Sequence, residues 1–539
     1  MPLHGPGRDY ARSMVLSRRG IAATSQTFAS QSAAQILAHG GSAVDAAIAA
    51  NAVLAVTEPM KCGIGGDLFV LHREAAAGKL TGLNASGPAP HALDPAHLAV
   101  RGFTTMPFDG IHAVTVPGAV KGWAAMHERF GKLPWKALFH DAIAFASEGF
   151  PVPEMIAETW AEPDLFTKIH QHPESVRVFL PNGKSPREGD LFRNPDMARA
   201  FGLIASEGAA AFYRGDIARA ILRTAGRLGS AMTAEDLASF APEWVEPVSI
   251  DYRGWRVHEL PPNSQGIAAL EMLNIMETFP AGDAFDSPAE MHKRIEAMKL
   301  AYSDLRRHNA EPRTYKAPLD RLLSKEYAQA RAALIDPLHA NPDVPAGDAI
   351  ASDTTYLTIV DREGNIASWI QSIYAEFASA ITVEGMGFLL QNRGGGFTLD
   401  AAHPNVLAGG KRPFHTIIPG FMERGDHHIG FGIMGGPNQP LAHAQFVSNI
   451  VDYGMNIQAA LEAPRFTKRT STGNDVWIES RVPLRTLEQL SARGHEIAIR
   501  RAYTQEMGRG QAILHDSTTG ANFAASDSRA DGAAIPEPF

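Results

Sequence analysis

The stretch Asp353-Thr354-Thr355-Tyr356-Leu357-Thr358-Ile359-Val360-Asp361 decides the fold, because it predicts a strand that leads into a tight turn. Its residues are β-branched or aromatic, and Thr355, Leu357 and Ile359 alternate on one face. The following residues, 361–365, have turn chemistry, since glycine and asparagine tolerate a positive φ. A second strand is predicted over residues 366–372, so the whole stretch indicates a β-hairpin.

The register of this hairpin brings two hydroxyl groups together. A turn centred on Glu363 pairs Val360 with Ile366 and places Thr354 opposite Ser372. On spacing alone, the ordinary interpretation is a hairpin with polar ends. The chemical interpretation needs further evidence from the rest of the chain.

Composition sets broad limits on the class of protein. The chain has 539 residues, of which 45% are apolar and 20% charged, as in globular proteins. No linker, repeat or low-complexity tract separates domains. The net charge of −9 argues against non-specific nucleic-acid binding and suits small-molecule partners. The single cysteine, Cys62, excludes an internal disulfide, and we expect it to be a buried structural thiol.

The first 25 residues carry arginines but no apolar segment of the kind found in secretory signals. No run of 18 or more apolar residues occurs, so no membrane partner is expected. These observations predict a cytoplasmic protein.

Predicted helices and strands alternate along the chain, which favours an α/β or α+β class. The helix predicted over 43–56 is apolar nearly all round and should be buried, with Ser42 as its cap. The glycine-rich loop 63–67 lacks the Lys-Ser/Thr of a phosphate-binding loop. Residues 336–352 are rich in proline, alanine and aspartate and predict a loop or linker. Other predicted helices cover 30–39, 267–277, 289–307, 439–452, 456–463 and 484–493, and other predicted strands cover 68–72, 251–259 and 475–479.

Several motifs occur together in a characteristic order. Thr354-Thr355-Tyr356 is followed by Asp361, by Gly364-Asn365 and by a glycine-rich segment that ends at Arg393. In this order the chain resembles the gamma-glutamyltranspeptidases over nearly its whole length. Further matching blocks are 40–47, 116–120, 261–264, 301–304, 411–413 and 452–454.

The resemblance implies a fold and a self-cleavage. The fold would be α+β, the four-layer αββα sandwich of N-terminal-nucleophile hydrolases. Cleavage between Asp353 and Thr354 would give a large chain, 1–353, and a small chain, 354–539, that form one intertwined unit. Thr354 would be the nucleophile, with its freed α-amine, of pKa about 7.7–8.0, as the base. Ser372 takes the place of the family's second hydroxyl.

The resemblance also locates an oxyanion hole. The family uses the backbone N–H groups of a Gly-Gly pair, and this chain has Asn438 and Gln439 at those positions. No cofactor or metal is expected. His427 and His428 are adjacent on a predicted strand and would point to opposite faces.

The substrate-binding positions depart from the family pattern. Arg393 stands where the family has Gln, Gly396 where it has Asp, His415-Thr416 where it has Ser-Ser, and Tyr374 where it has Asn. A carboxylate is lost and a guanidinium gained, so the pocket should repel a free α-amine and favour a carboxylate. The alternative for Arg393 is a structural ion pair on a loop.

These considerations predict a self-processing amidohydrolase or acyltransferase that acts through a threonine acyl-enzyme. Its substrate would be a small-molecule amide, either γ-glutamyl or carrying another carboxylate. The alternatives are an oxamate amidohydrolase, an amidase like the glutaryl and cephalosporin acylases, or an inactive binding relative. Loss of the amino-acid anchors favours hydrolysis over transfer. The assembly state stays open, with a homodimer of heterodimers among the alternatives.

Overall fold

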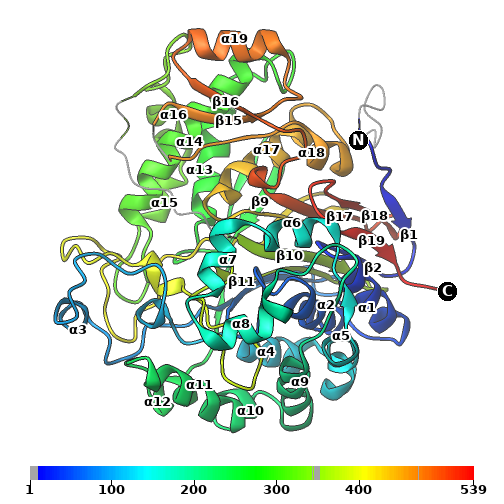
Figure 1. Cartoon of the computed structure of the whole chain (residues 1–539). Helices are drawn as coiled ribbons and strands as arrows, with labels where there is room; N and C mark the ends of the chain where they lie inside the picture. The colour runs from blue at the N-terminus through cyan, green and yellow to red at the C-terminus, as the bar shows by residue number, and fades with distance from the viewer. Residues whose placement is uncertain (1–9, 343, 345–352, 471–472) are drawn as a thin grey trace.

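The computed structural model describes residues 10–342, 344, 353–470 and 473–539, and two β-sheets form its centre (Figure 1). Within the described residues each of these sheets has seven strands, all antiparallel to their neighbours. The first sheet has the order β19 (Ala533–Pro536), β2 (Ile21–Thr24), β10 (Asp353–Val360), β11 (Ile366–Tyr374), β3 (Asp67–Glu74), β4 (Lys79–Ala85), β7 (Glu243–Val245). The second has the order β1 (Val15–Ser17), β18 (Ala521–Ser526), β17 (Arg509–Asp516), β13 (His427–Met434), β12 (Gly420–Arg424), β9 (Trp255–Glu259), β8 (Val248–Tyr252).

The two sheets pack face to face, through the side chains on one face of each sheet. β10 contacts both β13 and β17 of the second sheet. Tyr356 and Ile370 belong to the apolar cluster between the sheets, whereas Leu357, Ile359 and Trp369 belong to the cluster under the helices. This alternation follows from the period of two along a strand, and it confirms that Leu357 and Ile359 share a face.

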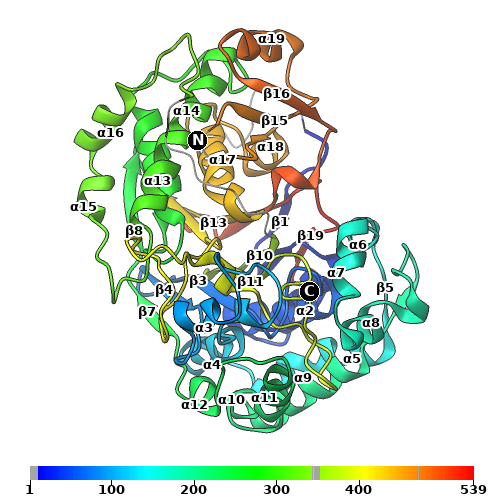
Figure 2. The ribbon, with the colours of Figure 1, turned by 60° about the vertical axis from the view of Figure 1, so that its left-hand side comes forward.

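Helices cover the outer side of each sheet (Figure 2). The helix α2 (Ala43–Thr57) contacts β10 and β11, and every one of its residues is buried, as its apolar surface predicts. Ser42 and Asp45 form a capping box at its start. With α2 on this side are α1 (Thr27–Ala38), α4 (Ala119–Phe130), α5 (His140–Glu148) and α9 (Pro195–Glu207); with the second sheet are α13 (Gly266–Glu277), α14 (Pro288–His308), α17 (Gln439–Val451) and α18 (Ile457–Glu462).

The remaining elements are short and peripheral. A small sheet contains β14 (Phe466–Thr467), β15 (Asp475–Glu479) and β16 (Glu496–Arg500), and β5 (Phe150–Pro151) pairs with β6 (Leu191–Phe192). The other helices are α3 (Pro95–Ala99), α6 (Glu154–Trp160), α7 (Pro163–Ile169), α8 (Pro173–Phe179), α10 (Ala210–Tyr213), α11 (Asp216–Arg227), α12 (Ala234–Ala238), α15 (Leu319–Leu322), α16 (Lys325–Ala332) and α19 (Leu484–Ala492). Among the described residues, none of these helices is both long and apolar enough to cross a bilayer.

One predicted element is wrong. The strand expected over 251–259 is two strands, β8 and β9, joined by a turn. Arg253 and Gly254 both have positive φ there, 49° and 81°, and the pattern of apolar residues continues across them. The predicted linker, 336–352, lies partly outside the described residues.

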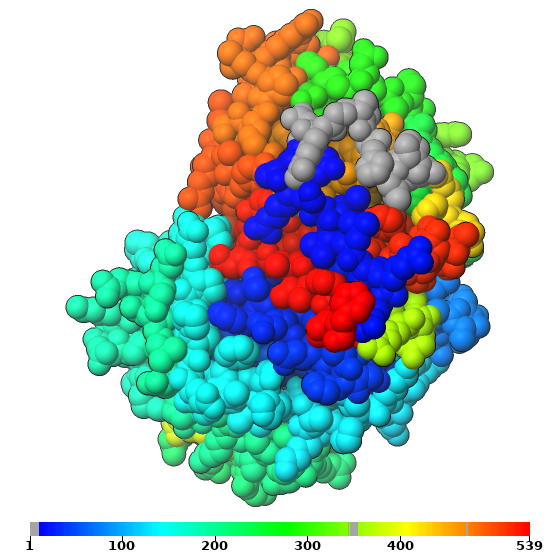
Figure 3. Space-filling view, turned by 90° about the vertical axis from the view of Figure 1, so that its right-hand side faces the viewer, coloured from blue at the N-terminus to red at the C-terminus, as the bar shows by residue number. Residues whose placement is uncertain are grey.

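Strands from both ends of the chain interleave in each sheet. β10 pairs with β2 on one side and with β11 on the other, and β12 pairs with β9. The N-terminal β1 pairs with β18, and the C-terminal β19 pairs with β2. Figure 3 shows these first and last segments side by side on one face. The parts before and after residue 353 therefore share one core.

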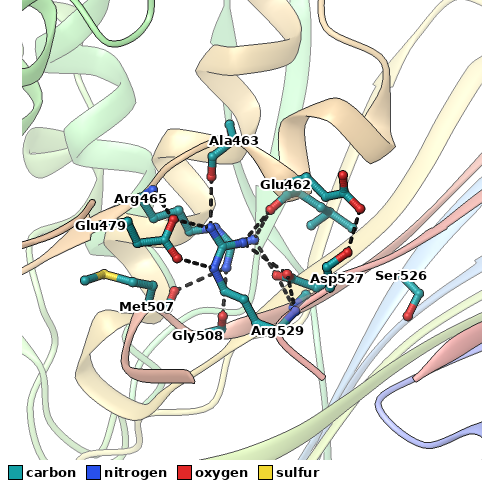
Figure 4. Close-up of polar contacts among 12 residues, drawn as sticks. Glu462, Ala463, Arg465, Glu479, Met507, Gly508, Ser526, Asp527 and Arg529 are labelled. Carbon is teal, nitrogen blue, oxygen red and sulfur yellow. Dashed lines mark hydrogen bonds and ion pairs between the residues drawn. The ribbon is translucent and has the colours of Figure 1, made fainter. Parts of the chain in front are cut away.

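A buried ion network connects the segments that carry Arg465, Glu479 and Arg529 (Figure 4). The guanidinium of Arg529 donates to both oxygens of Glu479 at 2.7 Å and to Asp527 Oδ1 at 3.0 Å. Arg465 donates to Asp527 Oδ2 at 2.6 Å and to the carbonyl of Gly508 at 2.8 Å. Gly508 lies against Gly435, so the network supports the turn that follows β13.

Candidate functional site

The two predicted hydroxyls meet at the open end of the hairpin. Val360 pairs with Ile366 as expected, and Thr354 Oγ1 donates to Ser372 Oγ at 3.3 Å. A bulge between Asp353 and Thr355 shifts the register at this point. Both hydroxyl side chains are fully buried. The side chain of Asp353 lies outside the described residues.

Arg393 belongs to the same site. Its Nη2 donates to Ser372 Oγ at 3.3 Å and its Nη1 to Thr416 Oγ1 at 2.8 Å. The side chain is fully buried, and burial lowers its pKa to about 10. Among the described residues, Nε has no hydrogen-bond partner and no carboxylate lies within ion-pair distance of the guanidinium. Arg393 therefore makes no direct ion pair with a described carboxylate, although Asp67 interacts with it electrostatically.

The aromatic ring of Tyr374 packs against the guanidinium of Arg393. The guanidinium carbon of Arg393 lies 4.0 Å from the centre of the Tyr374 ring, a cation–π arrangement. Tyr374 has φ of 83°, and its backbone N–H donates to Ser372 Oγ at 2.8 Å. Such strain in a bulky residue is commonly found where a site requires one fixed orientation.

A buried carboxylate, Asp67, lies beside Arg393. Asp67 Oδ1 accepts from the backbone of Gly87 and Gly118 and from Gln391 Nε2, at 3.0, 3.2 and 2.9 Å. Burial raises the pKa of Asp67 to about 7, although Arg393 and these donors act in the opposite direction. We did not predict this residue from the sequence. A charged residue directly before the apolar run Leu68–Leu71 could have pointed to it.

His415 joins this carboxylate to the predicted pocket. His415 Nε2 donates to Asp67 Oδ2 at 3.1 Å, while His415 Nδ1 accepts from the backbone of Ile417. Burial and the neighbouring Arg393 lower the pKa of His415 well below its ordinary value, so the ring is neutral. His415, Thr416, Arg393 and Tyr374 thus lie together, as the sequence suggested.

The turn from Gly435 to Gln439 also lies close to Thr354. The backbone N–H of Asn438 donates to Gly435 O at 3.1 Å, and that of Gln439 donates to Gly436 O. Gln439 Nε2 donates to Thr354 Oγ1 at 3.5 Å. The turn is therefore next to Thr354, but both backbone donors already have partners within it.

Two glycines allow this close arrangement. A Cβ on Gly66 would lie 2.2 Å from Ser372 O, and one on Gly65 would lie 2.0 Å from Leu389 O. Only glycine permits such a backbone approach. The glycine-rich loop is therefore part of the wall of the site.

The Asp361 motif has a structural role. Asp361 Oδ2 accepts from the backbone of Ala43 at 3.0 Å and from Asn365 Nδ2 at 2.9 Å. It thereby attaches the hairpin turn to the start of α2. Cys62 is buried as predicted, and burial raises its thiol pKa to about 12, so it stays protonated at neutral pH.

A cleft of about 790 Å³ opens beside the turn from Gly435 to Gln439. Pro437 and Asn438 form one side, and residues of α6, β14 and β16 form the others. Its lining carries both acidic and basic side chains, among them Glu158 and Arg501.

Among the described residues, one group of side chains has metal-like spacing, far from the hairpin in sequence: His292, Glu296 and His495. The Lys299 ammonium lies 2.8 Å from Glu296, and His292 Nδ1 lies 2.8 Å from His495 Nε2. The ammonium disfavours a cation at this place. His427 and His428 lie in β13, and His428 contacts Arg73 rather than the site.

Comparison with known proteins gives one family. The sequence model described as gamma-glutamyltranspeptidase matches residues 29–537. The "Glutathione hydrolase-like YwrD proenzyme" of Bacillus subtilis is 36% identical, with 97% of this chain and 99% of that protein covered. The "Oxamate amidohydrolase proenzyme" of Klebsiella pneumoniae is 32% identical, with 96% and 98% covered.

A solved structure agrees with these sequences. The cephalosporin acylase from Bacillus halodurans has 40% sequence identity and a TM-score of 0.92. The match covers 99% of this chain and 98% of that chain. The resemblance noted in the motifs is therefore confirmed over nearly the whole chain.

Proposed function

Because the chain belongs to the gamma-glutamyltranspeptidase family, and is thus a self-processing hydrolase or acyltransferase, we propose that Thr354 is its nucleophile. The bond between Asp353 and Thr354 would be the one cleaved in the precursor. The hydrogen bond from Thr354 to Ser372 supports this assignment, since a paired second hydroxyl orients the attacking oxygen.

The proposed processing has two steps. Thr354 Oγ attacks the carbonyl carbon of Asp353, an O–C bond forms, the C–N bond breaks, and the hydroxyl proton goes to the new α-amine. Water then hydrolyses the ester and frees the chains 1–353 and 354–539. The two would remain one unit, the four-layer αββα sandwich of N-terminal-nucleophile hydrolases, and the shared sheets support this.

Turnover would repeat the same chemistry on a substrate amide. The α-amine of Thr354 takes the hydroxyl proton as Oγ bonds to the carbonyl carbon. The tetrahedral adduct collapses, the C–N bond breaks, and the amine leaves with that proton. Water then releases the acid from the acyl-enzyme.

One observation supports a particular substrate class. Arg393 Nη2 and Thr354 Oγ1 each lie 3.3 Å from Ser372 Oγ, so the guanidinium is within about two hydrogen-bond lengths of the nucleophile. A carboxylate bound to Arg393 would sit next to the scissile carbonyl. The substrate is therefore an amide with a carboxylate very close to that carbonyl, as in oxamate, rather than one separated by a long chain.

The pocket does not require an α-ammonium group. Asp67 could attract one, but His415 and three other donors already occupy its oxygens. An ammonium would have to displace a buried hydrogen bond to reach it. The relative named as an oxamate amidohydrolase fits this substrate class.

Two substrates test the proposal on the processed enzyme. Oxamate and a γ-glutamyl anilide are compared, with Thr354→Ala as the blank for both. We expect ammonia release from oxamate and little anilide turnover. Efficient turnover of the anilide would contradict the carboxylate pocket and establish the γ-glutamyl activity instead.

A second candidate is an acylase with a large amine product. The cleft of about 790 Å³ beside Asn438 is much larger than ammonia needs, and the cephalosporin acylase has a similar structure. An oxalyl or glutaryl anilide would test it, since faster turnover than the unsubstituted amide favours this function. Hydrolysis rather than transfer, and a cytoplasmic location, remain part of the proposal; product analysis with an added amine acceptor and cell fractionation test them.

A further inference from the structure

Acyl transfer at Thr354 requires a donor for the negative charge that develops on the carbonyl oxygen. The backbone N–H groups of Asn438 and Gln439 are the donors that the sequence suggests. In the structure both donate within their own turn, to Gly435 O and Gly436 O. The charge therefore needs another donor close to the nucleophile.

The side chain of Gln439 has the required position. It is fully buried, and its Oε1 accepts from the backbone of Ile418 at 3.0 Å. That contact fixes the amide, so the Nε2 group faces Thr354 Oγ1 at 3.5 Å. An amide nitrogen at this distance from the attacking oxygen can reach an oxyanion bonded to the same carbon.

The surroundings hold this amide rigidly and favour negative charge. Gln439 is the first residue of α17, a buried helix of 13 residues whose N-terminus carries positive partial charge. Gln265 Nε2 donates to Thr416 O and to Gly436 O, which ties the turn to the Arg393 pocket. Preorganised donors of this kind need no rearrangement during the reaction.

We propose that Gln439 is a catalytic residue whose side-chain amide, through Nε2–H, stabilises the oxyanion formed when Thr354 attacks. This inference rests on the proposed role of Thr354. As the Oγ–C bond forms, the carbonyl electron pair moves to oxygen, and the Nε2–H donates to it. When the adduct collapses, the pair returns to form the carbonyl and the C–N bond breaks.

Two variants distinguish loss of the amide donor from a general effect on folding. Gln439→Glu keeps the size and the oxygen that accepts from Ile418 but removes the amide donor, and Gln439→Ala removes both. We expect kcat to fall about 100- to 1,000-fold in each, with KM little changed, because the hydrogen bond from Nε2 to the oxyanion exists only in the transition state. Gln445→Ala is the matched control, since Gln445 is also buried in α17 and contacts Phe466.

A second measurement excludes a merely structural effect. A boronic acid that forms a tetrahedral adduct with Thr354 should lose affinity in proportion to kcat/KM in the Gln439 variants. Inhibition by the product acid should stay unchanged.

The outcomes distinguish this inference from the proposed function. A Gln439→Glu enzyme with wild-type kcat would overturn the inference, as would an equal loss of affinity for the product acid and the boronic acid. If Thr354→Ala still turned over the substrate, the proposed function itself would fail. Substrate for these assays is whichever of oxamate, oxalyl anilide and γ-glutamyl anilide the wild type hydrolyses fastest.

Discussion

Asp67 Oδ2 accepts a hydrogen bond from His415 Nε2 at 3.1 Å, and both side chains are fully buried. This pair lies beside Arg393, so the protonation of Asp67 sets the net charge of the pocket. His415 stays neutral, because burial and Arg393 lower its pKa. The groups that face Asp67 are Arg393, His415, Gln391 and two backbone N–H groups.

We predict that carboxylate binding weakens as the pH rises through about 7. Burial raises the pKa of Asp67 to about 7, so below that pH the carboxyl is protonated and Arg393 is uncompensated. Above it, the ionised carboxylate offsets the guanidinium. The inhibition constant of an unreactive carboxylate should rise about tenfold, the effect of one pKa unit of coupling.

The matched variant for this experiment is Asp67→Asn, which keeps the shape and one acceptor oxygen. For this variant, the inhibition constant of the same carboxylate should not change between about pH 6 and pH 8. A variant profile as steep as that of the wild type would assign the pH dependence to another group.

Thr354→Ala should abolish both processing and turnover. The variant has no hydroxyl to attack either Asp353 or a substrate, and mass spectrometry should find one uncut chain. Thr355→Ser is the control, since Thr355 is the buried neighbour, and its hydroxyl contacts Gln371 O and the Cys62 thiol. Normal cutting in Thr354→Ala would refute the nucleophile assignment.

Arg393→Lys should impair carboxylate substrates selectively. Lysine keeps the charge but loses the planar pair of donors, which costs about 10- to 100-fold in kcat/KM for oxamate. Oxamide, which lacks the carboxylate, serves as the comparison and should change little. Equal losses on both substrates would mean that Arg393 acts on the fold or on Ser372 instead.

Arg529→Met should destabilise the protein strongly. The substitution takes one buried guanidinium from both Glu479 and Asp527, which keep only Arg481 and Arg465, and loss of such a partner costs about 3–5 kcal/mol in the free energy of unfolding. Arg501→Met is the control, because Arg501 pairs with Glu158 at the surface and should contribute no more than about 1 kcal/mol. Calorimetric unfolding midpoints compare the two in the uncut Thr354→Ala precursor, which folds as a single chain, and similar midpoints would contradict the prediction.

The sequence allowed a correct prediction of local features. The pairing of Val360 with Ile366 follows from turn chemistry, and the burial of α2 follows from its apolar surface. The break at Arg253 was missed because apolar residues continue on both sides of that turn.

The site could be predicted only in part, for a physical reason. Thr354 and Ser372 are neighbours through hairpin register, which a sequence displays. Asp67 reaches the pocket because β3 pairs with β11, and such long-range pairing leaves no local pattern. The direction of the Gln439 side chain depends on Ile418, a contact that spacing does not reveal.

The interleaved strands have a consequence for recovery from denaturation. β10 begins at the proposed cleavage point and lies between β2 and β11, so the cut would leave a new chain end inside a central sheet. The precursor would fold as a single chain, but the mature protein would have to reassemble from two pieces that each lack sheet partners. We therefore expect mature protein to lose activity irreversibly once heated past its midpoint, with a lifetime governed by its unfolding rate rather than by equilibrium.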